Sequence, residues 1–155
     1  DAPDFDGMID PDEKGNPRGI DVPKPAASFT VSTRKTAATA TATWRRAVAL
    51  MAGTVNNAAF RTHAAGELRL GPPALRERED GDWDVTFTFE LEPNLTNLAI
   101  GSLTVPSKDG WDAIWKLSKP DFDDTNKERV SKVAAVYVER VSTRTNFALL
   151  GVSTS

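Results

Sequence analysis

The sequence lacks cysteine, and His63 is its only histidine. The absence of cysteine excludes disulfide bonds, cysteine-ligated zinc and thiol catalysis. No serine lies in a Gly-x-Ser-x-Gly turn that could pair with His63, and no second histidine could complete a zinc site. Glycine-rich phosphate-binding patterns are also missing. We therefore expect no enzymatic activity, no cofactor and no metal ion.

Long apolar runs are missing too. No stretch approaches the roughly 18 apolar residues that a membrane-spanning helix needs, so we expect no membrane association. The chain begins at Asp1 and shows no basic start followed by an apolar stretch, which suggests processing or a longer natural chain. Lysine and arginine form no large basic face of the kind that nucleic-acid-binding proteins use. We therefore expect no direct nucleic-acid partner.

Acidic residues are concentrated at the start of the chain. Residues 1–25 hold seven acidic and three basic side chains, and residues 1–27 hold five of the ten prolines. Proline removes backbone donors and interspersed glycine raises the cost of ordering, so no regular element is expected there. The sequence predicts an extended acidic arm over residues 1–27, followed by a single β-rich globular domain over residues 28–155.

The clearest element is a strand over residues 82–91, where apolar residues from Trp83 to Leu91 alternate with polar ones. This pattern is typical of a half-buried antiparallel strand. Residues 67–70 should pair with it as a hairpin, around an exposed loop over residues 71–80. Further strands are expected over residues 28–33, 98–105 and 133–141, while residues 111–117 fit a strand or a helix. The predicted fold is β-dominated α+β, an antiparallel sandwich or curled sheet.

Residues 36–52 fit two structures. Alternating alanine and threonine over residues 38–43 have the period of a strand, whereas apolar residues from Ala40 to Met51 recur at helical spacing. Because alanine is the strongest helix former, we predict one helix over residues 36–52, packed on the sheet and capped by Thr36.

Two acidic runs have some features of calcium-binding loops. The run 10–21 has oxygen-bearing side chains at loop positions one, three and twelve and a glycine at six, but Lys14 occupies position five, where a ligand belongs. The run 121–126 lacks both the glycine and the closing glutamate. Solvated turns explain both runs better.

Four basic residues could form a patch near one end of the predicted helix. A solvated face, or a dock for an acidic neighbour such as the arm of another subunit, is favoured over a nucleic-acid site. Apolar side chains in the arm would anchor such a contact. The predicted interface residues are Phe5, Met8, Ile9, Arg34, Lys35, Arg45 and Arg46.

Three stretches of the chain together carry a resemblance to a known family. They are Gly53–Arg61 with Ala64–Glu67; Asp82–Phe89 with Pro93–Thr96; and Gly110-Trp111 with Trp115, Val136–Val141 and Phe147–Gly151. In this order they resemble a family of uncharacterised proteins of bacterial and phage-like genomes. The resemblance spans about residues 50–151 and implies no established activity. The loop over residues 71–75 departs from the family, which tends to be rich in glycine and serine there.

Two functions follow as hypotheses. The first is a virion structural protein, either a capsid-associated (decoration) or a tail-neck subunit, which associates with copies of itself and with other virion proteins. The edge of the strand over residues 133–141 could add strand pairing between subunits. The alternative is a β-sandwich binding module for a carbohydrate or a cell-surface partner. Trp111 and Trp115 would then form a stacking platform, although core packing is their favoured role.

Overall fold

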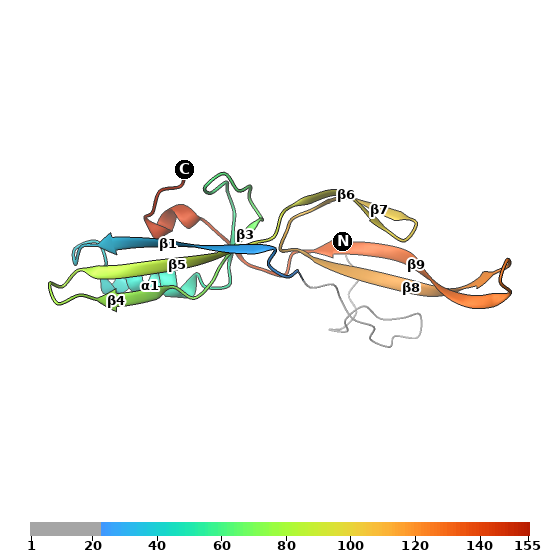
Figure 1. Ribbon diagram of the computed structural model, residues 1–155, viewed down its shortest axis with the longest axis horizontal. Helices are drawn as coiled ribbons and strands as arrows, with labels where there is room; N and C mark the ends of the chain where they lie inside the picture. Colours follow the sequence, from blue (N-terminus) through green and yellow to red (C-terminus); the bar gives the residue numbers. More distant parts are fainter. Residues whose placement is uncertain (1–22) are drawn as a thin grey trace. The chain divides into compact units, whose positions relative to one another are not determined.

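The computed structural model describes residues 23–155 and divides them into two compact units (Figure 1). The sheet unit comprises Lys24–Asn94, Asp109–Trp111 and Ser142–Ser155, and the hairpin unit comprises Leu95–Lys108 and Asp112–Val141. The acidic arm predicted over residues 1–27 falls almost wholly outside the described residues. The arm and the single domain over residues 28–155 both remain predictions.

The sheet unit is built on a six-stranded sheet. Its strands follow the order β1-β5-β3-β2-β10, and β4 also pairs with β5. The pairs are antiparallel except β10–β2, which is parallel. Its elements are β1 (Ala27–Lys35), α1 (Ala42–Leu50), β2 (Val55–Asn56), β3 (Leu68–Leu70), β4 (Ala74–Glu77), β5 (Trp83–Leu91), β10 (Arg144–Thr145) and the 3₁₀ helix η1 (Phe147–Leu150).

Strand β5 organises this sheet. One of its edges pairs with the whole of β1, and β3 and β4 share the other edge. The hairpin of β3 and β5 was predicted correctly, but part of the loop expected over residues 71–80 is the strand β4. Gly71-Pro72-Pro73 separates the two short strands, and the Gly71 N–H donates to the Thr88 carbonyl at 2.8 Å. The two prolines have no backbone donor, so the ladder is interrupted there.

The core lies on one face of β5. Val85, Phe87 and Phe89 are fully buried, as their alternation with polar residues predicts. Val48 of α1 and Phe147 of η1 belong to the same buried cluster. The segment after residue 146 therefore docks on the sheet through Phe147 and Leu150 and completes its core.

The helix is shorter than predicted. It begins at Ala42, where the Thr41 hydroxyl accepts a hydrogen bond from the Trp44 N–H at 3.1 Å. The preceding residues form a turn instead, in which the Ala40 N–H donates to the Thr36 carbonyl at 2.9 Å. Threonine side chains bond to nearby backbone and to each other, which favours turns and caps over helix interiors. Thr41 rather than Thr36 therefore caps the helix.

The hairpin unit contains two antiparallel hairpins. Residues 95–108, expected to hold one strand over 98–105, form two strands around a turn at Gly101. Of residues 111–117, for which a helix was also considered, those from Ala113 onward belong to a strand that continues to Asp123. The strand predicted over 133–141 begins earlier, at Glu128. The four strands are β6 (Leu95–Ile100), β7 (Leu103–Lys108), β8 (Ala113–Asp123) and β9 (Glu128–Glu139).

The fold class is as predicted from the sequence, β-dominated α+β with mainly antiparallel pairing. Within residues 23–155, no helix is long and apolar enough to cross a membrane.

Truncation of the central aromatic side chain tests this account of the core. Phe89→Ala should lower the free energy of unfolding by about 3–5 kcal/mol, because it leaves a cavity under β5. Thr88→Ala, on the opposite face of the same strand, should cost less than about 1 kcal/mol. Urea denaturation measures both, and equal losses would contradict the one-sided core.

Candidate functional site

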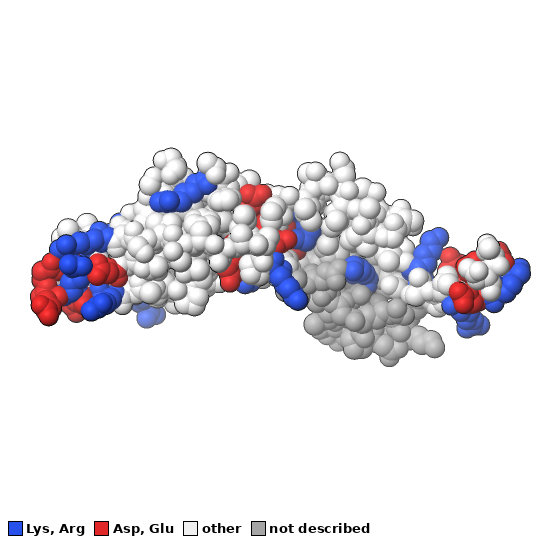
Figure 2. All heavy atoms as spheres, viewed as in Figure 1, with Lys and Arg blue, Asp and Glu red and all other residues white. Residues whose placement is uncertain are grey.

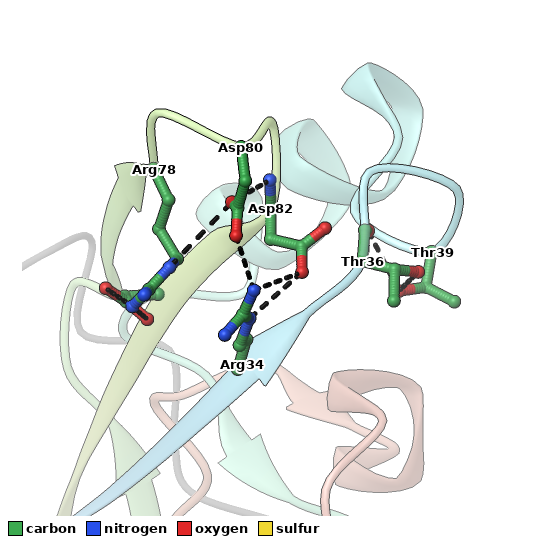
Figure 3. Close-up of polar contacts among 7 residues, drawn as sticks. Arg34, Thr36, Thr39, Arg78, Asp80 and Asp82 are labelled. Carbon is green, nitrogen blue, oxygen red and sulfur yellow. Dashed lines mark hydrogen bonds and ion pairs between the residues drawn. The ribbon is translucent and has the colours of Figure 1, made fainter.

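The turn between β4 and β5 carries a charged cluster that includes Arg34 of β1 (Figure 3). Arg34 Nε donates to Asp82 Oδ2 at 2.9 Å, and its Nη2 lies 2.5 Å from Asp80 Oδ2. The hydrogen bond to Asp82, followed by the charge of Asp80, raises the pKa of Arg34 above its ordinary value. Arg78 pairs with Asp84 at 3.2 Å. Because these groups are largely exposed, their ion pairs fix the turn more than they stabilise the fold.

Figure 2 shows acidic and basic atoms side by side around this turn. A depression of about 450 Å³ there is lined by residues 76–80 and Asp84, all of them charged. Small-molecule sites are mostly apolar clefts with a few placed polar groups. A solvent-open depression with only charged walls lacks that enclosure, so we do not assign it to a ligand.

The other basic residues of the predicted interface also lie in the sheet unit. The Arg45 guanidinium stacks 4.1 Å from the ring centroid of Trp83. Lys35 Nζ lies 5.7 Å from the ring centroid of Trp44 and donates to the Gly151 carbonyl. Arg46 is exposed on α1. Three of the four basic side chains thus contact their own sheet unit, and Phe5, Met8 and Ile9 lie outside the described residues.

Asn56 is the most enclosed polar side chain of the sheet unit, with no exposed surface. Its Oδ1 accepts from the N–H groups of Gly66 and Leu68, and its Nδ2 donates to the carbonyls of Ala58 and Ala64. These four bonds satisfy the whole side chain. Asn56 therefore holds the loop before β3 in place.

Glu67 and Asn94 extend this network to the connection between β7 and β8. Glu67 Oε1 accepts from the Asn94 N–H at 3.1 Å, and Asn94 Oδ1 accepts from the Gly110 N–H at 2.8 Å. Trp111 Nε1 then donates to the Glu67 carbonyl at 2.9 Å. Arg69 stacks 4.0 Å from the centroid of the Trp111 indole. Residues from all three stretches that carry the family resemblance therefore meet in one structural network.

His63 lies beside the same network. Its ring stacks on Phe29 with 5.6 Å between centroids, and its Nδ1 lies 3.9 Å from Glu67 Oε2. The adjoining Arg61 and Thr62 adopt positive φ angles of 46° and 69°, which form a tight turn. Glu67 also accepts a hydrogen bond from the Ala64 N–H. These contacts give His63 and Glu67 a packing role at the turn.

The acidic run 121–126 covers the end of β8 and the start of the turn that joins β8 to β9. Asp123 accepts hydrogen bonds from the Asn126 side chain and from the backbone N–H groups of Asn126 and Thr125, and these bonds lower the pKa of Asp123. Across residues 23–155, no group of three or more histidine, cysteine or acidic side chains could hold a metal ion. The run 10–21 lies outside the described residues.

The two tryptophans of the binding-module hypothesis have different surroundings. Trp111 is only 2% exposed and is held by the network around Glu67. It packs in the structure and cannot present a face to a sugar. Trp115 lies in β8 opposite Tyr137 of β9 and is half-buried. A stacking platform of both side chains is therefore not formed.

The hairpin unit exposes apolar side chains and grooves. Strands β8 and β9 have 11 and 12 residues, and Phe122 and Val130 near their connecting turn are 52% and 38% exposed. A groove of about 480 Å³ runs between β7 and β9, and a second depression of about 370 Å³ lies near Lys119 and Lys132. Among the described residues, these surfaces are the best candidates for contacts with another protein.

The glycine before Trp111 provides a test of the network. A Cβ added to Gly110 would lie 1.7 Å from the Glu92 carbonyl oxygen, which is backbone and cannot swing away. Gly110→Ala should therefore lower the free energy of unfolding by about 3 kcal/mol. Gly71→Ala is the matched control, because its Cβ would lie 3.4 Å from the nearest atom. Denaturation followed by tryptophan fluorescence compares them, and equal stability would contradict the close approach.

Comparison of the chain with protein-family models, curated proteins and solved structures found no match.

Proposed function

We propose that this chain is a structural subunit of a phage-like particle, capsid-associated or in the tail neck, which acts by association with copies of itself and with other virion proteins. The observation that carries the proposal is the exposed outer half of the β8–β9 hairpin. The resemblance to proteins of phage-like genomes supports the setting, and the virion is the proposed location.

A two-stranded hairpin is marginally stable by itself in water. The inner part of β8–β9 includes the buried Ala113 and Ile114, whereas most residues from Lys119 to Lys132 are exposed. No third strand pairs with either β8 or β9 within residues 23–155. A long hairpin with apolar side chains and open edges gains stability when a neighbouring protein covers it.

The hairpin also carries devices that limit unspecific pairing. Pro120 interrupts the donors of β8, and Lys119 and Lys132 place charge next to it. The register shifts between Leu117 and Ser118, so that Ala134 is an extra residue in β9. Charged residues, proline and bulges on open strands prevent indiscriminate aggregation. This combination suits a surface that assembles with a defined partner.

Light scattering of the full chain at several concentrations tests the proposed function. We expect the mean mass to rise with concentration to a defined oligomer or a larger assembly. A protein that stays monomeric up to millimolar concentration would overturn the proposal.

Substitution at the hairpin turn locates the contact. Phe122→Ser should weaken self-association several-fold and leave the unfolding midpoint nearly unchanged, because Phe122 is already 52% exposed in the single chain. Leu50→Ser is the matched control, since Leu50 is 68% exposed but lies on α1 of the sheet unit. Sedimentation equilibrium compares the three proteins. Equal weakening by both substitutions, or by neither, would argue against the hairpin as the contact.

A further inference from the structure

The lining of the groove between β7 and β9 suits an extended peptide segment. The groove is lined by five consecutive residues of β7, Leu103–Ser107, and by Ala135, Val136 and Val138 of β9. Consecutive residues of a strand point to opposite faces, so a surface that includes them all is the edge of β7 and not one of its faces. Two strand edges therefore flank the groove, and five of its side chains are aliphatic.

The depression beside this groove adds charge. It shares Leu103 with the groove and is lined further by Lys119, Asp121, Lys132 and neighbouring residues. Lys132 Nζ lies 3.8 Å from Asp121 Oδ2, and Lys119 stands opposite Lys132 in the β8–β9 register. Two lysines against one aspartate leave this end of the groove with a positive charge. An acidic partner is favoured there.

The shape of the groove restricts its occupant. Strands β7 and β9 are close neighbours, so a segment that lies along the groove must be narrow and must contact both strands at once. The β8 and β9 strands of a second copy pair with each other and therefore have only one free edge each. A single extended segment with apolar side chains and acidic charge fits better than a hairpin.

The first 22 residues of this chain have that composition. They combine Phe5, Met8 and Ile9 with seven acidic side chains and two basic ones, Lys14 and Arg18. At about 3.3 Å per residue, an extended segment of this length reaches about 70 Å, which is enough to cross from one subunit to another. We propose that the acidic arm of one copy docks in the groove between β7 and β9 of a neighbouring copy. This inference rests on the proposed self-association.

Disulfide trapping in the full chain tests the docking, because the native sequence has no cysteine. One protein carries Ile9→Cys and a second carries Val136→Cys, and the two are mixed and oxidised. A disulfide between them can form only across two copies. We expect at least tenfold more mixed dimer than in a control mixture of Ile9→Cys with Leu50→Cys, in which the second cysteine is exposed on α1.

A double variant separates docking across copies from docking within one chain. Ile9→Cys with Val136→Cys in the same chain should give linked oligomers under oxidation. A product that is only an internally linked monomer would overturn the proposal, as would mixed dimers no more frequent than in the Leu50→Cys control.

Charge substitution gives a second readout that does not depend on cysteine. Lys119→Glu with Lys132→Glu should weaken self-association at least fivefold at low salt and remove most of its salt dependence. Arg76→Glu with Arg78→Glu, the same charge change at exposed residues of the sheet unit, is the control and should have a smaller effect. Equal effects of the two pairs would overturn the assigned groove.

The failures of the two proposals can be distinguished. One outcome is that light scattering shows assembly of the full chain, while cysteine trapping gives no excess of mixed dimer and the two charge-substituted pairs behave alike. In that case the docking site is wrong and the proposed function stands. If the full chain remains monomeric, the proposed function and the docking site fail together.

Discussion

The docking of Gly110 and Trp111 on the sheet unit is the constraint on which the rest of the structure depends. In the sequence, the β6–β7 hairpin and the β8–β9 hairpin are separated by residues Asp109–Trp111, which belong to the sheet unit. The backbone of this connection approaches Glu92 so closely that only glycine fits, and its indole is tied to the Glu67 carbonyl. Asp109 also forms a salt bridge at 3.2 Å with Arg144 of β10, the first strand of the sheet unit after the β8–β9 hairpin.

The two units differ in how they are stabilised. The sheet unit has a core of packed aromatic rings, in which Phe89 contacts Phe29, Phe60 and Phe147 at centroid distances of 5.2 to 5.7 Å. Such pairs contribute beyond the area that they bury. The hairpin unit has few buried side chains, and the long β8–β9 hairpin is held together by the hydrogen bonds between its two strands. The sheet unit is thus a scaffold, and the hairpin unit carries the exposed apolar surface that could contact another protein.

The sequence predicted the elements whose periodicity is strong. The alternation from Trp83 to Leu91 located β5 and its buried face, because one side of that strand meets the core and the other meets solvent. It predicted β8 and the β6–β7 hairpin poorly. The exposed strands have no one-sided burial to produce alternation, and the turn at Gly101 is too short to stand out. The strand expected over residues 98–105 was predicted to end before Pro106, yet β7 continues to Lys108.

Candidate site residues were harder to predict than the fold. Arg34 and Arg45 were chosen as a free basic patch, but pairing with Asp82 and stacking on Trp83 depend on strands that are distant in sequence. The same holds for Asn56, whose four hydrogen bonds no local pattern indicates. The groove between β7 and β9 could not be foreseen, since one of its walls belongs to the β6–β7 hairpin, where the sequence predicted a single strand.

The place of Phe147 and Leu150 in the sheet core has a consequence for biosynthesis. Both side chains are buried against residues encoded some 60 positions earlier, and the whole hairpin unit is synthesised in between. A nascent chain that has released its hairpins from the ribosome still lacks part of its scaffold core. Contacts of such sequence separation form late, because a long loop must close first. The scaffold is therefore completed only after the hairpin segments have been translated.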